Sequence, residues 1–512
     1  MGTPITLKTM KADTRDAVID TMAKTWPLNA RQVYSEVRDT QHLNITYQGV
    51  HKVLNQLVKE KIVVAQDRKY ELDAAWIKSL RKFAETADKN YSKSTSAPYL
   101  EIGTGSSVEK DAFTAGKEAA EKALKQIKSD KKMQLVLVFA SGEYEKNYKE
   151  LLKGIVSITR TAPLSGSTTI GEINNRSLHR TITVTVFCAD DEIFRAVPIV
   201  LPITQSHYAE NSFNDILSLL EKKAGFEKRF PDLGIVFFPG YKRDTGMKAI
   251  APGFLTEFAN RFSNAFPLIG GLAGSNWNFD PTVQFCNTER YDDAIIFVCI
   301  HTKLKIGVRR LHGYTPLTKH HFKVRTKEGA VTEMAVIEDG KIKGYEPALE
   351  VYVRETGLAP KELKKSLPTF IKELIAQNKT PPLTRVSDGA HGFPMVIEGN
   401  TIRFSNPFNE GDIAQISKTS PEEITETTKR VILEACREGN IRKPLGVLLN
   451  SCAAIKAIID VHGINEIEKI RVGNLSTVPI FGCYNMGEIG PMAVPQGSGT
   501  VVALVFGNEL RE

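Results

Sequence analysis

One short pattern occurs twice in this chain and constrains its fold more than any other feature. Residues 162–173 read APLSGSTTIGEI, and residues 478–490 read VPIFGCYNMGEIG. Both stretches contain Pro-x-x-Gly, then four residues, then Gly-Glu-Ile. A third stretch, FPLIGGLAG from Phe266, repeats only the Pro-x-x-Gly part. The shared prolines are Pro163, Pro267 and Pro479, and the shared glycines are Gly166, Gly270 and Gly482.

Each copy belongs to a larger unit. An apolar run precedes each motif: LVLVFASGEY from Leu135, LGIVFFPGYK from Leu233 and LGVLLNSCAA from Leu445. A helical pattern separates this run from the motif, and a second apolar run follows. The spacing is too irregular for a solenoid. We therefore predict a mixed α/β (α+β) fold with duplicated strand-helix-strand-strand units that pack against one another.

The motif has a chemistry of its own. Proline suits a strand start, because that position needs no ladder N–H, and Gly166 and Gly482 fit a bulge or a close backbone approach. We expect positive φ at Gly171 and Gly487, where backbone N–H groups can hold an anion. Glutamates at 172 and 488 could accept hydrogen bonds from an ammonium group, so the set suits a zwitterion such as an amino acid. The alternative is a glycine-marked bulge with a capping glutamate that serves only the fold.

Residues 1–75 have a different pattern. Helical spacing occurs in ADTRDAVIDTMAKT, in LNARQVYSEVRD and in NITYQGVHKVLNQLVKEKIV, where Asn44 or Thr46 is the expected N-cap. Two strand-like runs then flank a polar turn at Asp67 and Arg68. This is the plan of a winged helix-turn-helix. Residues 76–98 read as a helix followed by a linker.

A winged helix predicts contact with double-stranded DNA. The third helix would present Tyr47, Gln48, His51, Lys52 and Asn55 to base edges, and Arg68 and Lys69 would contact phosphate. Residues 1–90 contain 15 Lys+Arg and 11 Asp+Glu, a balance of +4 (15 − 11) within the chain total of +8. Because DNA sites are usually read by dimers, we expect a homodimer. The alternative is a small helical module that binds protein or dimerises.

The remaining composition fits a cytoplasmic protein. The apolar runs are of strand length, so no membrane contact is expected, and the N-terminus lacks a signal-peptide core. The six cysteines form no C-x-x-C pair and several lie in apolar runs, which indicates reduced, buried thiols.

Several stretches together resemble the FIST sensory family: MQLVLVFASGEY with APLSGSTTIGEI, then GYEPALEVYVRETGL, and finally VPIFGCYNMGEIGP. The resemblance spans roughly residues 97–510. It implies an intracellular module that senses small molecules such as amino acids, with a FIST N-terminal-like domain at 99–300 and a FIST C-terminal-like domain at 301–512. The candidate ligand-binding residues are Gly166, Ser167, Thr168, Gly171, Glu172, Gly482, Cys483, Tyr484, Gly487 and Glu488.

An enzyme is the less favoured reading. No cysteine–histidine signature, P-loop or metal-ligand spacing is present, so we expect no catalytic set, no metal and no cofactor. The leading hypothesis is a one-component transcriptional regulator that couples ligand sensing to DNA binding. The competing hypothesis is a signalling adaptor whose N-terminal helices bind a protein partner.

Overall fold

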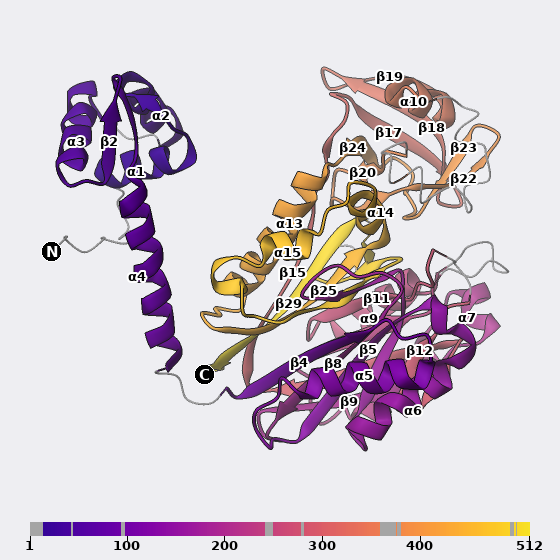
Figure 1. Ribbon diagram of the computed structural model, residues 1–512. Coiled ribbons are helices and arrows are strands. Elements are labelled where there is room, and N and C mark those ends of the chain that lie inside the picture. The colour runs from indigo at the N-terminus through magenta and orange to yellow at the C-terminus, as the bar shows by residue number, and fades with distance from the viewer. Residues whose placement is uncertain are drawn as a thin grey trace. The chain divides into compact units, whose positions relative to one another are not determined.

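The computed structural model divides the chain into two compact units (Figure 1): an N-terminal unit, residues 1–97, and a C-terminal unit, residues 98–512. The structure describes residues 14–41, 45–93, 98–240, 249–277, 281–358, 375, 380–491, 496–497 and 499–511. Residues 94–97 of the expected linker and the expected N-cap Asn44 lie outside these ranges. None of the helices that the structure describes is long and apolar enough to cross a membrane.

The N-terminal unit packs its helices against a small antiparallel sheet with the strand order β1-β3-β2. Its elements are α1 (Thr14–Lys24), β1 (Leu28–Asn29), α2 (Ala30–Gln41), α3 (Tyr47–Lys59), β2 (Val63–Gln66), β3 (Lys69–Leu72) and α4 (Ala74–Lys93). The predicted hairpin is confirmed. Its two turn residues, Asp67 and Arg68, have positive φ of 52° and 63°, as expected for a tight turn between twisted strands.

Helix α3 begins where the sequence predicts. The Thr46 side chain accepts a hydrogen bond from the Gly49 N–H at 3.1 Å and so caps the first turn. The apolar face of α3 fits the 3.6-residue period, because Val50, Leu54 and Leu57 are buried against α1 and α2. The opposite face of α3 stays exposed.

The C-terminal unit contains three repeats, each built on one motif copy. Each repeat is a strand, one or more helices, a buried central strand, a further helix, the Pro-x-x-Gly strand, a crossing strand and a return strand. The first has β4 (Leu100–Ser107), α5 (Ala112–Leu124), β5 (Met133–Ser141), α6 (Tyr148–Thr159), β6 (Leu164–Thr169), β7 (Gly171–Asn174) and β8 (Ile182–Ala189). The second has β9 (Phe194–Pro202), α7 (Gln205–Glu210), α8 (Asn214–Ala224), β10 (Leu233–Phe238), α9 (Ala251–Phe262), β11 (Leu268–Leu272), β12 (Gln284–Cys286), β13 (Glu289–Tyr291) and β14 (Ala294–Thr302). The third has β15 (Leu304–His312), α13 (Pro421–Glu438), β25 (Pro444–Cys452), α14 (Ala453–Val461), α15 (Glu466–Ile470), β26 (Ile480–Asn485), β27 (Glu488–Ile489), β28 (Gln496–Gly497) and β29 (Thr500–Leu510).

The three repeats exchange their crossing strands in a cycle. In each repeat the Pro-x-x-Gly strand lies parallel to the central strand, in the pairs β5/β6, β10/β11 and β25/β26. The chain then leaves its own sheet. Strand β7 pairs with β26 of the third repeat, β12 with β6 of the first, and β27 with β11 of the second. The motif that the sequence contains in two full copies and one partial copy therefore marks three sheets that exchange strands with one another.

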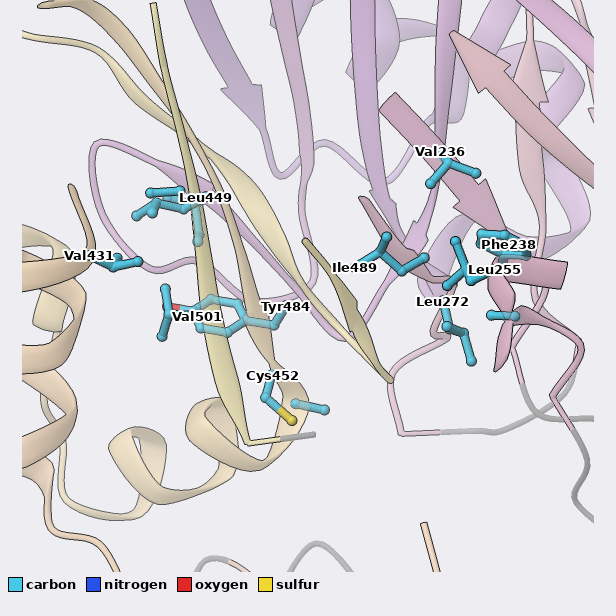
Figure 2. Close-up of a cluster of buried hydrophobic side chains, with 14 of the residues drawn as sticks. Val236, Phe238, Leu255, Leu272, Val431, Leu449, Cys452, Tyr484, Ile489 and Val501 are labelled. Atoms are coloured by element: carbon cyan, nitrogen blue, oxygen red, sulfur yellow. The ribbon is translucent and has the colours of Figure 1, made fainter. Parts of the chain in front are cut away.

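The three sheets share one core. Along β5, Leu135, Leu137 and Phe139 point toward the other two sheets, whereas Val136 and Val138 face α5 and α6. The central cluster joins aromatic rings of all three repeats, including Phe187, Phe237, Phe481 and Phe506. Figure 2 shows the crossing residue Ile489 lying near Val236, Phe238 and Leu272 of the second repeat.

The third repeat alone carries a long insertion between β15 and α13. It forms an antiparallel sheet with helix α10 (Ala348–Thr356) packed against it. Its strands are β16 (Thr315–Pro316), β17 (His321–Lys327), β18 (Ala330–Glu338), β19 (Lys341–Pro347), β20 (Leu383–Arg385), β21 (His391–Gly392), β22 (Pro394–Glu398), β23 (Thr401–Phe404) and β24 (Ile413–Lys418).

Candidate functional site

The shared glycines lie where two parallel strands pass very close together. Gly166, Gly270 and Gly482 have φ of 157°, 157° and 142°. A Cβ added at each would lie 1.8, 1.8 and 1.9 Å from a carbonyl oxygen of the central strand, on Val138, Val236 and Leu449 respectively. The close approach predicted at Gly166 and Gly482 is therefore made by the backbone of the neighbouring central strand.

The expectation of positive φ at Gly171 and Gly487 is wrong. Among the described residues, the glycines of the motif with positive φ are Gly166, Gly270 and Gly482. Gly171 starts β7 and is extended, as crossing to a new strand partner requires. Its missing side chain makes room instead, because a Cβ there would lie 2.8 Å from Cε of Lys456.

The structure brings the two complete motifs together at β26. Glu172 is the register partner of Cys483, and Gly171 is the partner of Tyr484. Glu488 lies on the neighbouring sheet, opposite Gly271. Burial raises the pKa of the Cys483 thiol well above its usual value, and the carboxylates of both glutamates contribute to this shift.

The second repeat has an equivalent residue that the sequence did not reveal. Gln284 pairs with Ser167 just as Glu172 pairs with Cys483. It is fully buried, and in its two amide orientations it donates to main-chain carbonyls, of Phe238 in one and of Tyr291 and Ala294 in the other. In the sequence, Gln284 is marked only as a polar residue between Val283 and Phe285, where the other two repeats have Gly-Glu-Ile.

Glu172 has its hydrogen bonds supplied by its own repeat. Its carboxylate accepts from Oγ1 of Thr169 at 2.6 Å and from both the N–H (3.2 Å) and Oγ1 (2.7 Å) of Thr181. Burial raises the pKa of this carboxyl, and the threonine donors oppose the shift. The arrangement fixes the start of the return strand β8 against the crossing strand.

Glu488 is less completely bonded. Its Oε2 accepts from the N–H (3.2 Å) and Oγ1 (2.9 Å) of Thr500, while Oε1 has no hydrogen-bond partner among the described residues. Burial raises the pKa of Glu488 to about 8, although Thr500, the Cys452 thiol and the Arg310 charge oppose part of this shift. Buried oxygens without partners cost free energy.

The remaining motif residues are buried. Thr168 Oγ1 accepts from the Val283 N–H at 3.0 Å, whereas Oγ of Ser167 has no hydrogen-bond partner among the described residues. The Tyr484 hydroxyl donates to Glu466, and Nζ of Lys456 lies 5.4 Å from the centre of the tyrosine ring. Burial raises the pKa of Glu466 to about 7.

The predicted DNA-contacting residues share one exposed surface of the N-terminal unit. Tyr47, Gln48, His51, Lys52 and Asn55 line a shallow groove on α3, together with Gln56 and Lys59. All seven are exposed, and Asn55 Nδ2 lies 3.1 Å from His51 Nδ1. Arg68 and Lys69 are exposed at the hairpin turn. The surface combines hydrogen-bonding and basic groups.

Comparison with known proteins identifies the domains of the C-terminal unit. Residues 134–335 match the FIST N domain, and residues 348–491 match the FIST C domain. FIST domains are generally signal-transduction sensor domains that bind small ligands. The chain is also similar to "Uncharacterized protein MJ1623" of Methanocaldococcus jannaschii, with 28% identity over 188 residues, covering 36% of this chain and 35% of that protein. It thus spans about a third of that relative's length.

Proposed function

We propose that this chain, with its FIST N and FIST C domains, is a one-component transcriptional regulator. The C-terminal unit would bind a small molecule such as an amino acid, and the N-terminal unit would bind double-stranded DNA as a homodimer. Ligand binding would shift the population of the DNA-competent state, which requires different ligand affinities in the two states. No catalytic step is part of this proposal.

The exposed face of α3 is the observation that carries the DNA-binding part. The element order α1, β1, α2, α3, β2, β3 supports a winged helix-turn-helix, with α3 as recognition helix and the β2–β3 hairpin as wing. Gln48 and Asn55 can read base edges, and Lys52, Arg68 and Lys69 can neutralise phosphates. The faces of α1 and α2 toward α3 are apolar and buried, so they hold α3 in place.

Selection of genomic fragments by the full chain, followed by fluorescence anisotropy across a salt series, tests this part. We expect specific binding whose affinity falls as salt increases, because phosphate contacts release counterions. Replacing Gln48 with alanine should weaken specific binding. Lys24→Ala, which removes a charge from α1 rather than α3, is the control. Absence of both specific binding and a salt slope would exclude DNA as the partner.

The adaptor alternative has one observation in its favour. Trp26 and Phe83 of the N-terminal unit are 47% and 64% exposed, and exposed aromatic side chains are enriched where proteins bind one another. If Trp26→Ala and Phe83→Ala abolish capture of a partner protein while DNA is not bound, the adaptor function replaces the regulator.

The motif residues are the proposed ligand contacts of the sensing unit. Glu488 supports this because one of its buried oxygens lacks a partner among the described residues. Glu172 accepts three hydrogen bonds within the fold, so it would contribute by positioning β7 beside Cys483 and Tyr484. A thermal-shift screen of the full chain with amino acids tests for a ligand.

A further inference from the structure

We propose that the third repeat and its insertion form a buried site for the carboxylate group of a small molecule, bounded by Glu488, Cys452, Tyr314 and His391. The inference deepens the sensing function proposed above and rests on it. The site lies at the carboxyl ends of the parallel strands β25 and β26, where open α/β sheets commonly bind ligands. Figure 2 shows Cys452 at this end of β25, near Tyr484.

Comparison of equivalent positions shows why the site forms in this repeat. In the first repeat, Thr169 pairs with Ser141 and its Oγ1 donates to Glu172. In the third repeat the corresponding pair is Asn485 with Cys452. The Asn485 side chain instead accepts from the Cys483 thiol at 3.2 Å. Glu488 therefore lacks the threonine donor that completes the bonding of Glu172, and it faces the weaker Cys452 thiol instead.

The residues that end the central strands, Ser141 in the first repeat and Cys452 in the third, also differ in their hydrogen bonds. The Ser141 hydroxyl donates to Oδ1 of Asn276 at 2.9 Å, so the strand end in the first repeat is closed by a hydrogen bond. Cys452 is buried and faces the Glu488 carboxyl, with the N–H groups of Gly499 and Ala454 directed at its sulfur. A thiol is a weaker hydrogen-bonding group than a hydroxyl, which leaves this end less tightly closed.

The insertion adds further polar groups to this end of the sheet. The rings of Tyr314 and His391 lie 4.8 Å apart, and the ring of His312 lies 4.3 Å from that of His391. Nδ1 of His391 is 2.6 Å from Oγ1 of Thr384, which leaves Nε2 as its other polar atom. The insertion thus contributes His391, and the segment leading into it contributes Tyr314.

Three buried polar atoms here have no hydrogen-bond partner among the described residues: Oη of Tyr314, Nε2 of His391 and Oε1 of Glu488. The three side chains are 7%, 1% and 0% exposed. These groups meet around Gly499: a Cβ added there would lie 2.7 Å from Cε2 of Tyr314, its N–H is directed at the Cys452 sulfur, and the next N–H, of Thr500, donates to Glu488. Leaving several such atoms unbonded is costly, and a bound polar molecule would satisfy them together.

The charges of these groups favour an anion. Burial raises the pKa of the Tyr314 and Cys452 side chains well above their usual values and lowers that of His391 well below its own. With the pKa of Glu488 at about 8, the carboxyl is mainly protonated at pH 7. The site then presents O–H donors beside Arg310, which is buried and remains a cation because its pKa is lowered only to about 10.

Helix α14 strengthens the preference for a carboxylate. It begins at Ala453, directly after Cys452, so its positive end lies at the site. A carboxylate can accept from a phenol and from a protonated carboxyl at the same time, and such charge-assisted hydrogen bonds are strong. An ammonium group would instead require Glu488 to give up its proton, and it would be repelled by the positive charge of Arg310.

Isothermal titration of the full chain at pH 7 with propionate, L-alanine and ethylamine tests the site. Propionate and L-alanine should bind, and ethylamine should not. Tyr314→Phe should weaken propionate binding about tenfold or more, because it removes one hydrogen bond to a charged group. Tyr148→Phe is the matched control, since it removes a buried hydroxyl that donates to the Ser141 carbonyl at 3.1 Å at the equivalent strand end of the first repeat, and it should leave the affinity unchanged.

Glu488→Gln distinguishes a ligand carboxylate that accepts a hydrogen bond from protonated Glu488 from a ligand ammonium group that donates one to ionised Glu488. In wild-type protein, propionate affinity should fall above about pH 8 as Glu488 loses its proton. The glutamine amide keeps a donor and cannot ionise, so the variant should bind at pH 7 and lose this fall. Binding of ethylamine, loss of propionate binding in Glu488→Gln at pH 7, or no propionate binding at millimolar concentration would each overturn the inference.

Failure of this site and failure of the sensing function give different results. If propionate binds as described but no carboxylate changes the affinity for DNA, the site stands and the regulator function is wrong. If a small molecule without a carboxylate changes DNA affinity equally in wild-type protein and Tyr314→Phe, the regulator function stands and the inferred site is wrong.

Discussion

Gly482→Ala should severely destabilise the sheet of the third repeat. The added Cβ would lie 1.9 Å from the carbonyl oxygen of Leu449, and real Cβ atoms essentially never come within 3.0 Å of such an atom. Strand β26 would have to move about 1 Å or more away from β25 to relieve this contact. It is also paired on its other side with β7 and buried on both faces, so it cannot move freely.

The cost can be estimated from what the movement breaks. Loss of two ladder hydrogen bonds and of the surrounding packing should cost about 3–5 kcal/mol, the range of severe core substitutions. Amide hydrogen exchange of peptides from β25 and β26 measures this locally, without assuming that the whole chain unfolds in one step. A loss of about 3 kcal/mol corresponds to roughly 150-fold faster exchange, at about 1.4 kcal/mol per factor of ten.

Gly344→Ala is the control for this substitution, because a Cβ at that exposed position of β19 meets nothing within 4 Å. It should leave exchange in β25 and β26 unchanged. If exchange in Gly482→Ala stays within about threefold of wild type, close approach of the two strands is not the reason for a glycine at this position.

Three more perturbations act on buried or basic groups. Because burial raises the pKa of Glu488 from its ordinary 4.5 to about 8, the folded state binds an extra proton between these values, and stability should fall as pH rises through this window by up to about 1.4 kcal/mol per pH unit. Urea unfolding at several pH values should show a shallower slope for Glu488→Gln; an equal slope would contradict this. Tyr484→Phe removes the donor to the buried Glu466 carboxyl and should cost about 1–3 kcal/mol in hydrogen-exchange or urea measurements, whereas an unchanged stability would show that the contact is weak. Replacing Arg68 and Lys69 together by alanine should reduce the salt slope of DNA binding by about two, and an unchanged slope would remove the hairpin from the interface.

Hydrophobic periodicity and the positions of capping and turn residues predicted much of the fold. The third N-terminal helix, its Thr46 cap and the hairpin at Asp67 and Arg68 are local features, because caps and turns depend on a few adjacent residues. The buried central strands were equally evident as short apolar runs. The exchange of crossing strands was not, since pairing of β7 with β26 joins residues about 310 positions apart and leaves no local signal.

The candidate site was predictable only in part. Glu172 and Glu488 stood out because the same three letters occur twice, yet their bonding differs through Thr169 and Asn485, which the motif does not single out. His391 was visible only as a polar residue in a loop-like segment. Its approach to Tyr314 depends on how the insertion packs against the third repeat, which sequence patterning does not encode.

The most direct test of coupled ligand and DNA binding is fluorescence anisotropy of the full-length protein on a selected DNA fragment, with and without a small molecule that binds the C-terminal unit. We predict sequence-specific, salt-dependent binding whose affinity changes about fivefold or more with ligand, a typical coupling between two sites. Specific binding that a saturating ligand leaves unchanged, or no specific binding at any salt concentration, would contradict this prediction.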